Sequence, residues 1–155
     1  MQPDVFNDGT LSFQLAANAS GLSQVRVTAI DNGATNNTSV PQTFNILVTE
    51  INDPPLISLA TDVIVAESQE VTIPNFFTNL DPIETGQTIT PQFNYTGDPI
   101  FHITPSLDAG QTDLHFRLHD SASGTATVTF TATDNGGTAN GGDNDTSVTF
   151  TITSS

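Results

Sequence analysis

The strongest constraint on the fold of this chain is an internal sequence repeat. Residues 11–33 align with residues 114–136 at a constant offset of 103, with 12 identities in 23 positions. After a three-residue length difference in the next loop, residues 43–46 align with residues 149–152. A repeat of this length predicts tandem domains joined end to end. We therefore expect residues 1–53 to be the second half of one module and residues 54–155 to be one complete module.

The pattern of apolar residues predicts strands throughout. Residues 125–133 alternate five threonines with Ala126, Val128, Phe130 and Ala132, which is the two-residue period of a half-buried strand. Residues 114–118 and 148–152 show the same alternation, and turn dipeptides such as Asn-Gly separate the apolar runs. The sequence therefore predicts an all-β fold, an antiparallel Greek-key β-sandwich with about seven strands per module.

The charge of the chain excludes one large class of partners. Seventeen acidic residues face two basic ones, Arg26 and Arg117, for a net charge of -15. Such a chain repels a phosphate backbone, so we expect no nucleic-acid partner. Clustered carboxylates attract divalent cations, although a merely soluble acidic surface is the alternative. The chain has no cysteine, hence no disulfide or thiolate site, and no apolar stretch long enough for a membrane span.

Several short motifs resemble those of a known family. The linker Glu50-Ile51-Asn52-Asp53-Pro54-Pro55 resembles the cadherin inter-domain motif Asp-x-Asn-Asp-x-Pro, with Glu in place of the first Asp. The segment Val65-Ala66-Glu67 and residues 124–137 are similar to bacterial cadherin-like and Ig-like repeats of very long surface proteins. The resemblance covers essentially the whole chain. It implies a non-catalytic adhesion or spacer module, extracellular or on the cell surface of a bacterium, whose partners are neighbouring repeats of the same protein.

The resemblance also implies a calcium site. In cadherins, calcium lies between consecutive domains and is held by oxygen atoms, of which the ion takes about six to eight. Carried over by position, the ligands are three linker residues, a pair in place of the second domain's Asp-x-Asp, and the aspartate after the penultimate strand: Glu50, Asn52, Asp53, Asp81, Glu84 and Asp134. By the same resemblance, Glu67 serves the following junction and Asp31 the preceding one.

The sequence also departs from the family pattern. The Leu-Asp-Arg-Glu motif is missing, and Asp81 lies further from Glu84 than the usual pair, so we expect one ion or none rather than three. The alternative is that residues 52–55 are only a stiff linker, because two prolines fix φ and push the residues before them into an extended conformation. Asp143 and Asp145 are a further, weaker pair of candidate ligands.

The chain lacks the motifs of common enzymes. His115 and His119 are four residues apart, which on a strand separates them by roughly 13 Å, so they cannot share one ion. The sequence contains no Gly-x-Ser-x-Gly elbow and no His-Glu-x-x-His motif. We therefore expect no catalytic activity.

Two other functions remain open at this point. The loops at residues 31–40 and 134–145 differ in length between the two copies, as ligand-binding loops often do, and could bind a carbohydrate or a protein. They carry no Trp or Tyr to stack on a sugar. The half module at residues 1–53 could instead be completed by another subunit, giving a strand-exchanged fibre, or it could be a fragment of a longer array.

Overall fold

The structure is a computed structural model that describes residues 3–60, 62–66 and 70–155. The chain divides into two compact units, unit 1 (Met1–Ile51) and unit 2 (Asn52–Ser155). The described residues form strands, turns and a single short 3₁₀ helix, Ala139–Gly141. No helix in these residues could span a bilayer. The expected all-β class is confirmed.

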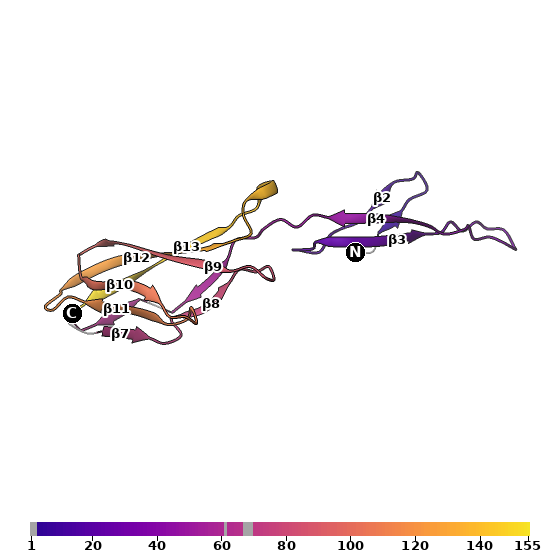
Figure 1. Ribbon diagram of the computed structural model, residues 1–155. Helices are drawn as coiled ribbons and strands as arrows, with labels where there is room; N and C mark the ends of the chain where they lie inside the picture. The colour runs from indigo at the N-terminus through magenta and orange to yellow at the C-terminus, as the bar shows by residue number, and fades with distance from the viewer. Residues whose placement is uncertain (1–2, 61, 67–69) are drawn as a thin grey trace. The chain divides into compact units, whose positions relative to one another are not determined.

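Unit 1 consists of two separate strand pairs (Figure 1). Its strands are β1 (Asp4–Val5), β2 (Leu11–Ser12), β3 (Gly21–Val27) and β4 (Gln42–Val48). β1 pairs with β2, and β3 pairs with β4, both antiparallel. No described residue of unit 1 is buried, so this unit has no core of its own.

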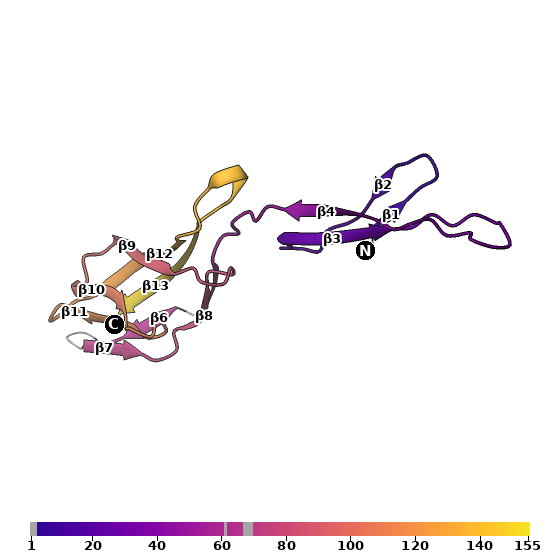
Figure 2. The same cartoon turned by 45° about the vertical axis from the view of Figure 1, so that its right-hand side comes forward.

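Unit 2 is a β-sandwich. Its strands are β5 (Leu56–Leu59), β6 (Val63–Val65), β7 (Glu70–Ile73), β8 (Phe77–Asp81), β9 (Ile89–Gly97), β10 (Phe101–Leu107), β11 (Leu114–Leu118), β12 (Gly124–Asp134) and β13 (Asp145–Ser154). One layer contains the sheet β10-β11-β7, and the other contains the sheet β6-β13-β12-β9 (Figures 1 and 2). β5 and β8 form a further antiparallel pair. The Greek-key arrangement stays a prediction.

Unit 2 has nine strands in its described residues, whereas about seven were expected. The difference arises because two segments are divided and their halves pair in different sheets. β5 pairs with β8 and β6 with β13; likewise β7 pairs with β11 and β8 with β5. Pro74, which cannot donate a ladder hydrogen bond, and Asn75, with φ at 51°, interrupt the chain between β7 and β8.

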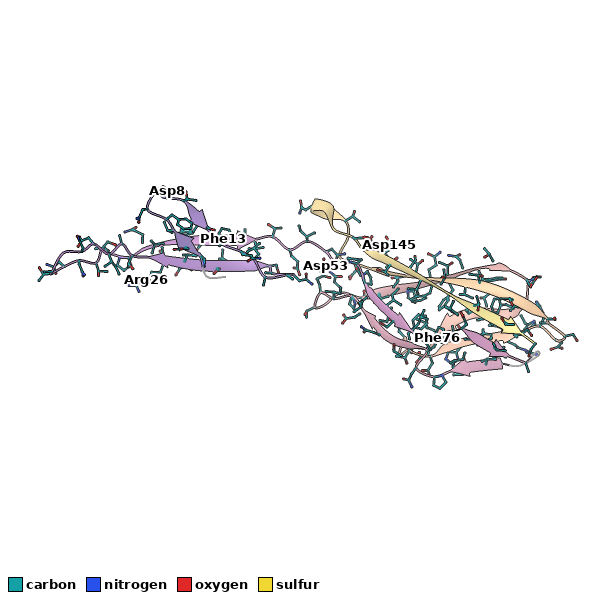
Figure 3. The ribbon with its side chains drawn as sticks, turned by 180° about the vertical axis from the view of Figure 1, so that it is seen from behind. Asp8, Phe13, Arg26, Asp53, Phe76 and Asp145 are labelled. Atoms are coloured by element: carbon teal, nitrogen blue, oxygen red, sulfur yellow. The ribbon has the colours of Figure 1, made fainter. Side chains whose placement is uncertain are left out.

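The core of unit 2 is an aromatic cluster between the two layers. The ring centroids of Phe77 and Phe130 lie 4.4 Å apart, those of Phe93 and Phe130 4.9 Å apart, and those of Phe76 and Phe150 4.7 Å apart. Phe76 lies among the inward-pointing side chains of unit 2 (Figure 3). The alternating pattern of β12 places its apolar residues in this core and its threonines on the opposite face.

The two units share one hairpin pairing. In unit 2, Val128 lies opposite Phe150, and in unit 1 the corresponding residues Val25 and Phe44 also lie opposite each other. β12 is further flanked by β9 and β13 by β6, but β3 and β4 have no such neighbours in the described residues. The same local hairpin is therefore found with flanking strands in unit 2 and without them in unit 1.

Candidate metal centre at the start of unit 2

Asn52, the first residue of unit 2, is held by both polar atoms of its side chain. Its Nδ2 donates to Asp134 Oδ1 at 3.0 Å and to the carbonyl oxygen of Asp143, while its Oδ1 accepts from Gln87 Nε2 at 2.7 Å. Its backbone carbonyl also accepts from the Asp143 N–H at 3.0 Å. Asn52 thus joins the end of β12, the loop before β9 and the loop before β13.

Asp53 connects to the same region through its backbone. Its N–H donates to Glu84 Oε1 at 2.9 Å. Asp53 lies where the chain enters unit 2 (Figure 3). The linker residues are therefore hydrogen-bonded to two residues that the sequence predicts as ligands, Asn52 to Asp134 and Asp53 to Glu84.

The loop that carries Glu84 has a strained backbone. Ile83 has φ at 73°, and the Glu84 N–H donates to the Pro82 carbonyl at 3.0 Å, which closes a three-residue turn. A γ-turn of this hand is rare and strained, and a positive φ is especially unfavourable for a β-branched residue. Backbone strain of this kind concentrates at functional sites, where the surrounding structure maintains it.

Three buried side-chain oxygens in this region have no hydrogen-bond partner in the described residues: Glu84 Oε2, Gln87 Oε1 and Asp134 Oδ2. Asp134 as a whole is only 4% exposed. An unpaired buried polar atom costs about 1–3 kcal/mol, and more if it is charged. All three are acceptors, so a bound cation would satisfy them, and these residues fit a metal ion that prefers oxygen.

Unit 2 contains one Lys or Arg side chain, Arg117, that could neutralise these carboxylates. Its guanidinium lies 4.0 Å from the carboxylate of Asp120. Burying a carboxylate without a paired charge is costly, so a cation bound beside Glu84 and Asp134 would lower that cost.

The other predicted ligands are placed differently. The Asp81 side chain is exposed, and its Oδ1 accepts from the Ile83 N–H at 2.8 Å, which supports the turn described above. Glu50 is exposed at the end of unit 1. Asp31 is also in unit 1, and Glu67 lies outside the described residues. Within unit 2, the structure therefore brings together Asn52, the Asp53 backbone, Glu84 and Asp134.

A metal centre made only of charged or imidazole ligands is not present in the described part of the chain, where no three His, Asp or Glu side chains gather to hold an ion. The site at Asn52 differs because it combines two carboxylates with two side-chain amides. Sequence reasoning missed Gln87, which belongs to no recognisable motif, and the Asp143 carbonyl. Gln87 is identified as part of the site by its hydrogen bond to Asn52, which lies 35 positions away in the sequence.

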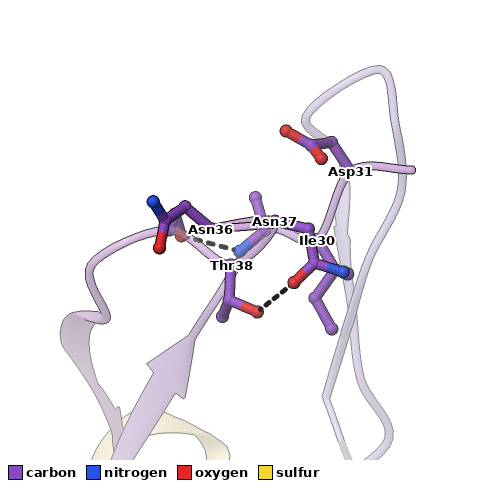
Figure 4. A pocket seen from close by; sticks show the side chains of 7 residues that line it. Ile30, Asp31, Asn36, Asn37 and Thr38 are labelled. Atoms are coloured by element: carbon purple, nitrogen blue, oxygen red, sulfur yellow. Dashed lines mark hydrogen bonds between the residues drawn. The ribbon is translucent and has the colours of Figure 1, made fainter. Parts of the chain in front are cut away.

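The loop at residues 31–40, a candidate binding loop, encloses a small open pocket (Figure 4). Its polar groups are largely engaged within the loop. Asp31 Oδ1 accepts from the Gly33 N–H at 2.7 Å, and the Ala29 N–H donates to Ser39 Oγ at 2.9 Å. The residues that line the pocket include no aromatic side chain.

The histidines lie on the surface of unit 2. His115 Nδ1 lies 2.9 Å from Thr72 Oγ1, across the β11–β7 pair. The rings of His102 and His119 meet edge to face, with centroids 5.4 Å apart. Both of those residues are exposed.

No protein-family model matches the chain, and no curated protein matches it significantly.

Proposed function

We propose that this chain is a non-catalytic structural segment of a long extracellular repeat protein, made of cadherin-like or Ig-like β-sandwich modules and stiffened by calcium at the residues that join two modules. The sandwich of unit 2 suits such a role, as does the hairpin pairing that the two units share. The sequence repeat adds an independent line of support.

One observation carries the calcium part of this proposal. The linker residues Asn52 and Asp53 are bonded to Asp134 and Glu84, and buried acceptors remain unpaired beside them. A cation bound there would hold the linker against the sandwich by a charge interaction in addition to hydrogen bonds. Calcium suits the site because it accepts carboxylate and amide oxygens in flexible geometry.

The test is a calcium titration of the full chain. Binding is measured by calorimetry, and the particle dimensions by small-angle scattering with calcium and then with excess chelator. We expect calcium to bind and to give a longer, less flexible particle, and chelator to reverse the change. Dimensions that do not respond to bound calcium would remove the stiffening function, and no binding would remove the metal as well.

A second candidate function is self-assembly through unit 1. The β3–β4 hairpin exposes apolar side chains on its strands and loops, among them Leu22 at 67% and Leu47 at 72%. Its strand edges also lack neighbours in the described residues. If another subunit completes this half module, the mass in solution will exceed that of one chain and will rise with concentration. A monomeric mass at all concentrations argues against a fibre.

A further inference from the structure

The unpaired acceptors at the start of unit 2 follow from a directed chain of hydrogen bonds. Asp134 Oδ1 and the Asp143 carbonyl are both acceptors, so the Asn52 side chain must turn its Nδ2 toward them. Asn52 Oδ1 then faces Gln87, which must turn its own Nε2 toward that oxygen. Gln87 Oε1 is left buried and without a donor among the residues that the structure describes.

Glu84 and Asp134 are held in the same manner. Glu84 Oε1 accepts from the Asp53 N–H, and Asp134 Oδ1 accepts from Asn52 and from the Gly136 N–H at 2.8 Å. Each of the three side chains thus has one polar atom fixed by the linker residues and a second, an oxygen, buried and unpaired. No donor among the described residues satisfies these three oxygens, and all three are atoms of the kind that a cation binds.

We infer that Gln87 is a ligand of the bound calcium ion, together with Glu84 and Asp134, and that the ion is held wholly by residues of unit 2. This inference rests on the proposed function and specifies its site. Two carboxylates balance the charge of a divalent ion, and the amide oxygen of Gln87 adds a neutral ligand of a type that calcium accepts. Water and backbone carbonyls complete the coordination.

This ligand set leaves out four of the six residues that the sequence resemblance names. Asn52 and Asp53 position the ligands by hydrogen bonds, and the other two are Asp81 and Glu50. Asp81 is exposed and supports the turn at Ile83, so its carboxylate is not required. Glu50 belongs to unit 1, and a site held by unit 2 alone does not need it. The ion then stabilises unit 2, including the hydrogen bonds that hold its first residue, Asn52. It does not act as a bridge whose ligands are divided between two modules.

The experiment compares calcium affinities of full-chain variants by calorimetry. Gln87→Leu removes both polar atoms, whereas Gln87→Glu removes the donor to Asn52 but keeps an oxygen ligand. Gln92→Leu, at an exposed position of β9, is the matched control. We expect Gln87→Leu to weaken calcium binding at least about tenfold, about the effect of losing 1.4 kcal/mol. Gln87→Glu should stay within a few-fold of the unchanged chain, as should Gln92→Leu.

Two further variants locate the ion. Glu84→Gln should weaken calcium binding strongly, and Glu50→Gln should leave it unchanged. Circular dichroism in the presence of chelator checks that each variant is folded, and Gln87→Ala, which also removes both polar atoms, replaces Gln87→Leu if that variant is not folded. Magnesium, added in place of calcium, should bind more weakly because it retains its waters and demands a stricter geometry.

The outcomes separate the inference from the proposed function. If the unchanged chain binds no calcium, both are overturned. If it binds calcium and Gln87→Leu binds equally well, the ligand role of Gln87 is wrong while the calcium module stands. Equal losses in Gln87→Leu and Gln87→Glu would show that Gln87 only positions Asn52. A loss in Glu50→Gln matching that in Glu84→Gln would show that the ion is not held by unit 2 alone.

Discussion

Asn52 Nδ2 donates to Asp134 Oδ1 at 3.0 Å, across 82 positions of the sequence. This bond joins the first residue of unit 2 to the last residue of β12. The linker is thus part of the hydrogen-bonded structure of the sandwich and not only a connection to it.

Replacing Asn52 by Leu should destabilise unit 2. The change removes the partner of Gln87 Nε2 and one donor to Asp134, and leaving buried polar atoms unpaired should lower the free energy of unfolding by about 2 kcal/mol. Urea denaturation with chelator present measures this effect without bound metal. Asn94→Leu, on an exposed position of β9, should change the free energy by less than about 0.5 kcal/mol. Equal effects of the two changes would mean that the Asn52 network contributes nothing.

Replacing Gly136 by Ala should disrupt the same network by steric overlap. A Cβ at Gly136 would overlap Asn52 Oδ1 and Gln87 Nε2, so we expect a loss of about 1–3 kcal/mol in unfolding free energy. The repeat offers a matched control in Gly33, where a Cβ would meet the exposed Asp31 carboxylate at 2.9 Å and the Thr35 carbonyl at an ordinary contact distance of 3.9 Å. Gly33→Ala should therefore be nearly neutral in the same denaturation experiment. A neutral Gly136→Ala would contradict the close packing at this site.

The aromatic residues at corresponding positions of the repeat should contribute unequally to stability. Phe116 is 1% exposed, whereas Phe13 is 40% exposed. Phe116→Ala should lower the unfolding free energy by about 3–5 kcal/mol, because it leaves a cavity in the core. Phe13→Ala should cost less than about 1 kcal/mol. If Phe13→Ala lowered the unfolding free energy as much as Phe116→Ala, unit 1 would have a covered core in solution. The mass in solution would then show whether a partner or a second copy of the chain supplies the cover.

The loop between β10 and β11 should make stability depend on pH in acid. The N–H groups of Asp113, Thr112 and Gly110, in that order of effect, hold the pKa of Asp108 below its usual value of 3.8. Since the folded pKa is depressed, the stabilisation is present above pH 3.8 and is lost as the pH falls through the lower folded pKa.

Asp108→Asn tests this dependence, because the amide oxygen can still accept hydrogen bonds but does not titrate. Unfolding free energies are measured at several pH values between about 5 and 2. The unchanged chain should lose stability more steeply below pH 3.8 than the variant does. Parallel curves would show that the Asp108 carboxylate has no part in acid sensitivity.

Local patterns in the sequence were enough to predict the all-β class and several of the strands, although not their number. The alternation of Thr and apolar residues in residues 125–133 corresponds to β12, because side chains of a strand point to opposite faces in turn. Proline cannot donate a ladder hydrogen bond, and within sheets it is therefore found on edge strands. Pro91 and Pro105 lie on β9 and β10, which are edge strands of their sheets. These properties depend only on backbone geometry and on neighbouring residues.

The candidate site could be predicted only in part. The family resemblance named Asn52, Asp53, Glu84 and Asp134, which the structure places in one region. It also named Asp81 and Glu50, which contribute no side chain to that network in unit 2. Gln87 carried no sequence signal, because the direction of its amide depends on a chain of hydrogen bonds through Asn52 to Asp134.

Phe13 and Phe116 show that the sequence alone did not predict which repeat residues are buried. By itself, the sequence determined that both lie in alternating segments of the same repeat, at the centre of the shared pattern Leu-x-Phe-x-Leu. Only the tertiary structure decided that Phe116 is buried and Phe13 exposed, because burial requires a second layer that distant residues supply. In unit 2 the core cluster that contains Phe116 includes Phe76 and Phe77, and no described strand of unit 1 corresponds to the segment that carries them. Period and pairing are local properties of a strand, whereas a core and a metal site depend on which distant segments are brought against it.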